Sequence, residues 1–174
     1  MAGQLSLWAV PSREDAVTYV DTICRLASDS GTKPFAPHIT VTSADHGGGT
    51  GAAARDVIGR VASEFESFTV ELTHFEDSDQ RFRCLTAVAR LHGPLVRLHA
   101  GLVAALSAEP KGYEPHLSLL YGELPAPQRA HLRTGLEPEL LGMITINALQ
   151  AVDTSHADYG RWSVEASWPL RVGP

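Results

Sequence analysis

The sequence predicts an α+β domain built from two similar halves. With 44% apolar residues, the 174-residue chain can form a hydrophobic core of its own. The order strand, helix, histidine-bearing strand occurs twice along the chain. The motif "FAPHITV" at residues 35–41 also returns in similar form as "YEPHLSLLYG" at residues 113–122. We therefore interpret residues 1–174 as a single domain of two lobes related by an internal repeat, with the first motif near 35–43 and the second near 113–122.

The first half begins with a short β-strand, "LSLWAVP" at residues 5–11, that ends at a proline. Ser12 and Asp15 then form a pattern typical of a helix start, and Gly31 stands where a helix commonly ends. A strand, "HITVTS", follows at 38–43. Between the two ends, apolar residues that recur at helical spacing predict the buried face of the helix, namely Val17, Val20, Ile23 and Ala27.

The remaining elements follow the same order in both halves. The first half closes with a helix around 57–61 and a half-buried strand at 68–72. The second half is predicted to contain a strand at 81–91, a helix at 95–106, a strand at 113–122, a helix at 125–133, and strands at 144–152 and 161–170.

Composition restricts the classes of partner. Fourteen Lys and Arg against twenty Asp and Glu give a net charge of −6, which works against binding of long nucleic acid. No apolar run approaches the roughly 18 residues of a membrane span, and the first residues lack the pattern of a signal peptide. We therefore expect a cytoplasmic protein with no membrane partner, and any phosphate ligand should be small.

Two other features of the sequence are interpreted as structural. Cys24 and Cys84 lack the CxxC spacing of a zinc or redox site, which favours buried thiols, although the sequence leaves a disulfide between them open. The stretch "DHGGGTGAA" at 45–53 has neither GxGxxG nor P-loop spacing and is interpreted as a flexible loop rather than a phosphate-binding loop.

The two histidine motifs are the strongest functional signal. Alternate residues of a strand share a face, so His38 lies beside Thr40, and His116 lies beside Ser118. Pairing the two strands around a pseudo-two-fold axis would bring two imidazoles and two hydroxyls into one cleft. Hydrolysis of a phosphodiester needs a base, an acid and donors for the non-bridging oxygens, and these four groups supply them without a metal.

The alternative interpretation is a pair of buried histidines that serve only to form structural hydrogen bonds. The repeat of the whole motif, with an aromatic residue two positions before each proline–histidine pair, favours the functional interpretation. The six other histidines show no metal-binding spacing and are interpreted as surface residues: His46, His74, His92, His99, His131 and His156.

With these motifs, the chain resembles the 2H phosphoesterase superfamily, and within it the 2′,3′-cyclic phosphodiesterase branch known from plants and yeast. The resemblance implies a bilobal fold with two antiparallel sheets lining a central cleft and helices outside, with no metal or cofactor. It carries the catalytic role to His38 and His116. Further family site residues correspond to Thr40 and Ser118 as phosphate-contacting hydroxyls, to Tyr121, and to the cleft aromatic Phe82.

Three aromatic positions raise further questions. Tyr121 would face away from His116 if the strand ran straight, so the resemblance requires a turn or bulge near Leu120. Phe82 suits either core packing or stacking on a nucleotide base. Trp162, which matches a family tryptophan of the last strand, is interpreted as a core residue.

Together with the two histidine motifs, the resemblance implies hydrolysis of a nucleoside 2′,3′-cyclic phosphate or of ADP-ribose 1″,2″-cyclic phosphate to a phosphomonoester. The expected partner is a small nucleotide with a cyclic phosphate, bound by a monomer. Two alternatives stay open: processing of an RNA end or a 2′,5′ linkage by the same machinery, and a nucleotide-binding module without turnover.

Overall fold

The computed structural model describes residues 3–46, 51–109 and 112–173, and its elements repeat in order. The first half contains β1 (Gly3–Pro11), α1 (Arg13–Ser30), β2 (Ile39–His46), α2 (Ala52–Ser63) and β3 (Phe68–Asp77). The second half contains the 3₁₀ turn η1 (Arg81–Arg83), β4 (Leu85–Ala89), α3 (Gly93–Ala105), β5 (His116–Leu120), α4 (Ala126–Thr134), η2 (Pro138–Leu140) and β6 (Gly142–Asp153). A last 3₁₀ turn, η3 (Tyr159–Arg161), and β7 (Ser163–Pro169) follow.

In the described ranges the strands form one seven-stranded antiparallel sheet in the order β1-β2-β5-β4-β3-β6-β7. The α+β class is confirmed, but the two expected sheets are joined. Ile39 of β2 pairs with Leu117 of β5, and β3 pairs with β6 along five residues. The reason is the length of β6, whose 12 residues reach both β3 and β1. The sheet therefore curves back on itself.

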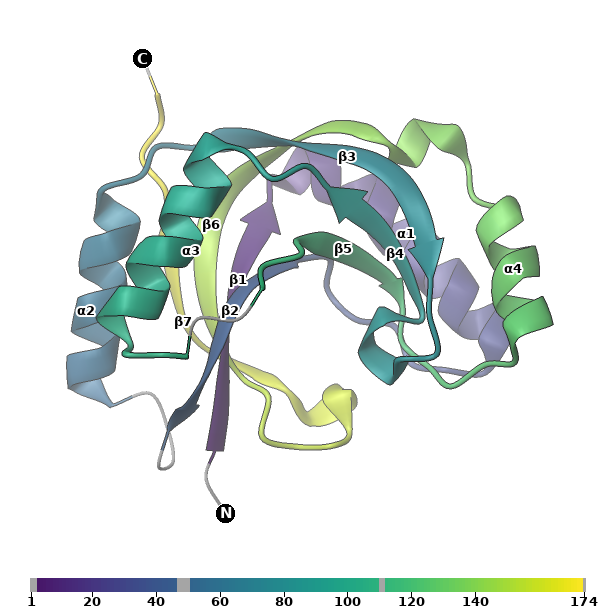
Figure 1. Cartoon of the computed structure of the whole chain (residues 1–174), viewed down its shortest axis with the longest axis horizontal. Coiled ribbons are helices and arrows are strands. Elements are labelled where there is room, and N and C mark those ends of the chain that lie inside the picture. Colours follow the sequence, from purple (N-terminus) through teal and green to yellow (C-terminus); the bar gives the residue numbers. More distant parts are fainter. Residues whose placement is uncertain (1–2, 47–50, 110–111, 174) are drawn as a thin grey trace.

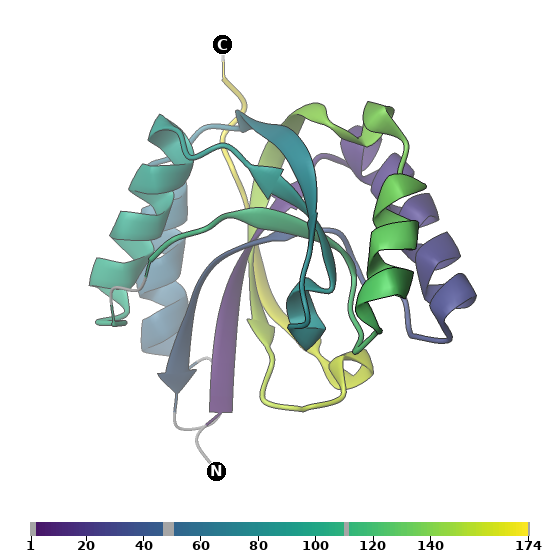
Figure 2. The same cartoon turned by 45° about the vertical axis from the view of Figure 1, so that its right-hand side comes forward.

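The helices cover the outside of this curved sheet in two pairs (Figures 1 and 2). Helices α2 and α3 lie together on one side, and α1 and α4 lie on the opposite side. Fully buried aliphatic side chains fill the space between helices and strands, among them Leu7, Ile23, Leu98 and Leu117. None of the helices in the described part of the chain is long and apolar enough to span a bilayer.

Helix α1 begins and ends where the sequence predicts. The Ser12 hydroxyl accepts a hydrogen bond from the Asp15 amide at 3.2 Å, which satisfies one of the unpaired N–H groups of the first turn. Gly31 ends the helix with φ 66°, in the left-handed region that glycine adopts without strain.

The predicted buried face of α1 is partly wrong. Ile23 and Ala27 are buried, but Val17 and Val20 are 56% and 41% exposed. Tyr19 takes the inward position instead, because its hydroxyl donates a hydrogen bond to the Leu140 carbonyl at 2.9 Å and its ring is buried. The buried face of α1 is therefore rotated relative to the face that the spacing of aliphatic residues predicts.

The predicted strand at 81–91 is also corrected, because the strand begins only at Leu85. Before it, the Ser78 hydroxyl donates to the Arg83 carbonyl at 2.9 Å and the Ser78 amide donates to the Cys84 carbonyl at 3.3 Å. These bonds hold residues 78–84 in a tight turn that contains Phe82.

The cysteines are both free thiols in the structure. Cys84 is buried, as expected, whereas Cys24 is exposed on α1, which corrects that part of the prediction. The central residues 47–50 of the glycine-rich stretch 45–53 lie outside the described residues, so the flexible-loop interpretation stays a prediction.

Candidate active site

His38 sits immediately before β2 and is held on several sides. Its Nδ1 lies 2.7 Å from the Ala36 carbonyl oxygen. Because a carbonyl only accepts, the ring hydrogen is on Nδ1, and Nε2 is left for other partners. Trp8 stacks on the ring with centroids 3.5 Å apart and planes 9° from parallel. Only 3% of the surface of His38 is exposed, so the hydrogen bond, the stacked ring and burial together fix the orientation of its imidazole.

His116 is held in the same way at the start of β5. Its Nδ1 donates to the Glu114 carbonyl at 2.8 Å, so its Nε2 is also left free of the backbone. In both motifs the acceptor lies two residues before the histidine, and the residue between them is a proline. The proline ring fixes the backbone φ angle at that point. This explains the placement of a proline directly before each histidine.

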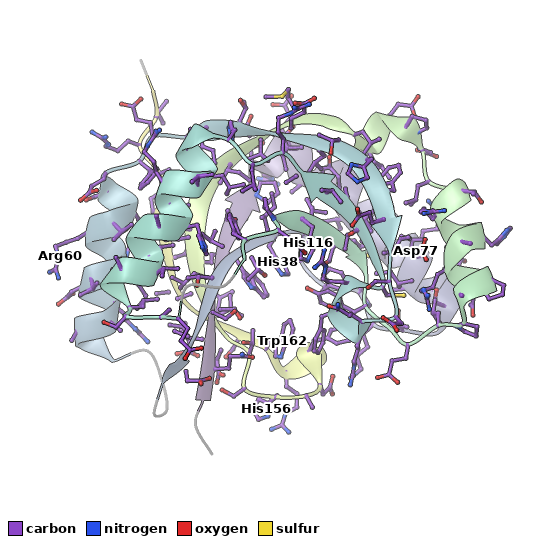
Figure 3. All side chains as sticks on the ribbon, viewed as in Figure 1. His38, Arg60, Asp77, His116, His156 and Trp162 are labelled. Atoms are coloured by element: carbon purple, nitrogen blue, oxygen red, sulfur yellow. The ribbon has the colours of Figure 1, made fainter. Side chains whose placement is uncertain are left out.

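The two histidines line one cavity of about 530 Å³ under the curve of the sheet. Figure 3 shows them close together at the centre of the molecule, with Trp162 facing them from the loop below and His156 farther out. All six residues predicted for the site line this cavity: His38, His116, Thr40, Ser118, Tyr121 and Phe82. Residues far apart in the sequence are thus brought together as expected, while their chemical roles stay predictions.

The two hydroxyls occupy equivalent places in the two halves. Thr40 pairs with Trp8 across β2 and β1, and Ser118 pairs with Thr86 across β5 and β4. The Ser118 hydroxyl donates to the Phe82 carbonyl at 3.2 Å. To bind a phosphate oxygen, it has to exchange that carbonyl for the ligand, because a hydroxyl has one hydrogen to donate.

A β-bulge turns Tyr121 toward the cavity, as the family resemblance requires. Leu85 pairs with Leu120 and Thr86 with Ser118, so the residue between them in β5, Leu119, has no partner in β4. The bulge shifts the side-chain alternation, and the Tyr121 hydroxyl reaches Nε2 of His38 at 3.3 Å. Since that nitrogen is the acceptor of a neutral His38, the phenol donates this bond. Burial raises the pKa of Tyr121 and keeps it protonated.

Burial also sets the charge of the histidines. It lowers the pKa of His38 to about 4, and the hydrogen bond to Ala36 only partly opposes this effect. Burial likewise lowers the pKa of His116, whose ring is only partly buried. Each imidazolium would be desolvated in this cavity, and the two would repel each other. Both rings are therefore mainly neutral in the free protein at pH 7.

Sequence reasoning missed several residues that line the cavity. Trp8 stacks on His38, Arg83 forms a 2.8 Å ion pair with Glu114 next to His116, and Trp162 faces the cavity instead of the core. One further wall carries hydroxyl and amide groups, from Gln4, Ser6, Ser43, Thr154 and Ser155. His156, predicted as a surface residue, is exposed and also borders the cavity. Within the described ranges, no three His, Cys, Asp or Glu side chains gather closely enough to hold a metal ion.

The fold and the site together define a class of protein. A curved antiparallel sheet that places two His-x-Ser/Thr strands side by side over one cavity is the arrangement of a 2H phosphoesterase. The chain belongs to the 2′-5′ RNA ligase superfamily, whose family model matches residues 11–156.

Solved structures share this fold over nearly the whole chain. TT0787 of Thermus thermophilus is 18% identical with a TM-score of 0.69, and the match covers 98% of this chain and 100% of that one. LigT of E. coli in its apo form is 15% identical with a TM-score of 0.59, covering 98% of this chain and 99% of its own. The comparison with curated proteins finds no match.

Proposed function

We propose that this chain hydrolyses a cyclic phosphodiester to a phosphomonoester without a metal ion. The proposed substrates are a nucleoside 2′,3′-cyclic phosphate and ADP-ribose 1″,2″-cyclic phosphate. The observation that carries the proposal is the matched pair of histidines. Each is tied through Nδ1 to a backbone carbonyl, which leaves Nε2 free of the backbone, and both border one cavity with a hydroxyl two residues away. Nε2 of His38 accepts a hydrogen bond from Tyr121 in the free protein and has to exchange it for water in the reaction.

The proposed reaction uses these groups in complementary roles. One Nε2 takes a proton from water as the water oxygen bonds to phosphorus. The bond between phosphorus and one ribose oxygen breaks, and the other histidine gives its Nε2 proton to that oxygen. Thr40 and Ser118 donate to the non-bridging oxygens, on which negative charge shifts in the transition state. The product keeps the phosphate on the second ribose oxygen.

The cavity also suits the rest of a nucleotide. Beside the histidines it is lined by the rings of Trp8, Phe82 and Trp162, and aromatic rings bind bases by stacking without reading their identity. LigT, which shares this fold at low identity, has been crystallised with 3′-AMP and with phosphate. Of these ligands, 3′-AMP is a nucleoside phosphomonoester, the class of the proposed product.

A second candidate is cleavage of a 2′,5′ linkage between two nucleosides. The observation in its favour is a second hollow of about 390 Å³ that shares Thr40, Arg83 and His116 with the main cavity. A leaving nucleoside would occupy this hollow. Two carboxylates, Glu109 and Glu114, also line it, which disfavours a longer phosphate chain there. Turnover of a 2′,5′-linked dinucleotide at a rate above that of a cyclic phosphate would favour this candidate.

Activity toward a cyclic nucleotide should survive exhaustive chelation. The proposed acid, base and charge-stabilising donors are side chains of the protein, so no step depends on a divalent metal. The test is the release of phosphomonoester from adenosine 2′,3′-cyclic phosphate after dialysis against EDTA, with the His38→Ala variant treated in the same way as the blank. Loss of activity in EDTA and its return with Mg²⁺ or Zn²⁺ would contradict the mechanism. Binding of the cyclic nucleotide without turnover would instead indicate a nucleotide-binding module.

The value of kcat/KM should follow a bell-shaped pH profile with its maximum below about pH 6.5, the usual histidine pKa. The reaction needs one neutral and one protonated histidine, and burial lowers the pKa of both. As the pH rises toward neutrality, the pair loses its last proton and the acid is missing. As the pH falls through about 4, His38 is protonated as well and the base is missing. A maximum above pH 7.5 would contradict this assignment.

The two limbs of that profile should separate the roles. The more exposed ring of His116 holds its proton to higher pH than the buried His38, so we propose His116 as the acid and His38 as the base. The limbs report the coupled pair and not single residues. Residual activity of a His38 variant should lack the low-pH limb, and that of a His116 variant should lack the high-pH limb. The opposite pattern would exchange the two roles.

A further inference from the structure

Tyr159 lies outside the cavity but links the segment that carries Trp162 to the segment that leads into His38. Its hydroxyl accepts a hydrogen bond from the Lys33 amide and donates one to the Lys33 carbonyl, both at 2.9 Å. One phenol thus satisfies both backbone groups of one residue across the fold. Replacing it with phenylalanine would remove both bonds and leave the ring.

The neighbour of Tyr159 strengthens the same link. Both carboxylate oxygens of Asp158 contact the Lys33 ammonium, at 2.9 and 2.8 Å. Since both side chains are about half exposed, solvent weakens this ion pair. The segment 154–162, which supplies part of the cavity wall, is fixed in this way to the segment that leads into His38.

The ring of Tyr159 also contacts aromatic side chains of the site. It meets Phe82, Tyr121 and Trp162 edge-on or tilted, with centroid distances of 6.5, 5.2 and 6.1 Å. Phe82 and Trp162 in turn lie 5.3 Å apart and both line the cavity, whereas Tyr159 does not. Such edge-to-face contacts fix the direction in which a ring presents its face.

We propose that Tyr159 is a positioning residue that fixes the rings of Phe82 and Trp162 as the platform on which the base of the substrate stacks. This inference rests on the proposed function and specifies how the site selects nucleotides over simpler cyclic phosphates. The hydroxyl of Tyr159 acts through the platform and never meets the substrate. Its removal should therefore affect binding of the base and leave the reaction at the phosphate in place.

The test compares Tyr159→Phe with the unmodified protein on two substrates. Adenosine 2′,3′-cyclic phosphate carries a base, and glycerol 1,2-cyclic phosphate has the same five-membered phosphate ring without one. Tyr159→Phe should raise KM for the first substrate about 5-fold, a part of what stacking contributes, with kcat nearly unchanged. KM for the second substrate should stay the same. An equal change for both substrates, or a loss of kcat alone, would overturn the proposal.

The chain offers a matched control for the loss of a phenol hydroxyl. The Tyr113 hydroxyl is buried and has no hydrogen-bond partner within the described part of the chain, so Tyr113→Phe removes no such link. It should leave the ratio of KM values for the two substrates unchanged. In a Phe82→Ala background, Tyr159→Phe should add little, because part of the platform on which it acts is gone. Full additivity would indicate a general structural role and contradict the inference.

A binding measurement keeps the inference testable if the protein turns over neither substrate. Calorimetry with 3′-AMP and with inorganic phosphate separates the contribution of the nucleoside to binding affinity from that of the phosphate. Tyr159→Phe should weaken binding of 3′-AMP about 5-fold and leave binding of phosphate unchanged. Absence of turnover in the unmodified protein would then disprove the proposed function, while equal affinities of both forms for 3′-AMP would disprove the role of Tyr159.

Discussion

Replacing either His38 or His116 with alanine should lower kcat for a cyclic nucleotide by about 10² to 10⁴. Each substitution removes one of the two Nε2 atoms that the backbone hydrogen bonds leave for proton transfer. The double variant should lose less activity than the product of the two single losses. The acid and the base act in one step, so once one of them is removed the other contributes little. Single-turnover kinetics on saturating substrate would measure the effect on the chemical step.

His74→Ala is the matched control for this experiment. His74 lies on β3, pairs with Glu76 at 3.1 Å, and is exposed outside the cavity. Its loss should leave kcat unchanged. A loss as large as that of the paired histidines would show that the proposed site is wrong. His38→Ala also opens a space beside Trp8, so thermal unfolding of each variant should be compared before a kinetic effect is interpreted.

Removing a hydroxyl should lower kcat less than removing a histidine. Thr40→Ala or Ser118→Ala should each cost about 10 to 10³, the range seen when one donor to a developing anion is lost. KM should change little, because these bonds strengthen as charge shifts to the non-bridging oxygens. The Ser118 variant also leaves the Phe82 carbonyl without its present donor, so this turn at the cavity wall could shift as well.

Thr69→Ala provides the comparison for these hydroxyl variants. Thr69 is an exposed strand residue of β3 and does not border the cavity. Its replacement should leave kcat and KM as they are. If Thr40→Ala and Ser118→Ala raised KM in parallel and left kcat unchanged, the hydroxyls would bind ground-state substrate and the assignment to transition-state stabilisation would fail.

The sequence predicts the parts of the site that depend on local rules. Alternation along a strand places Thr40 beside His38 and Ser118 beside His116, and the repeat predicts that the two pairs meet. The requirement for a bulge near Leu120 is met in β5. Helix caps such as Ser12 and Gly31 are also visible locally, since capping depends on the residue and its near neighbours.

The parts that the sequence does not predict depend on contacts between distant segments. Trp8 stacks on His38 because β1 pairs with β2, and no pattern within "LSLWAVP" indicates that contact. Arg83 of η1 forms an ion pair with Glu114 of the second motif, which is distant from it in the sequence. The sequence places Trp162 within a predicted core strand. In the structure β7 begins at the next residue, Ser163, and the ring of Trp162 lines the cavity.

The junction between the two halves at the site affects how well the protein tolerates substitutions there. Between β2 and β5 the described backbone pairs at a single position, Ile39 with Leu117, whereas β3 and β6 pair along five residues. Tyr121 adds to the weaker junction, since it stacks on Phe35 at 3.8 Å and bonds to His38. Active sites usually contain residues whose replacement increases stability at the expense of function. Here Tyr121 and His38 also contribute contacts to the weaker junction, so replacing either of them should lower stability as well as activity.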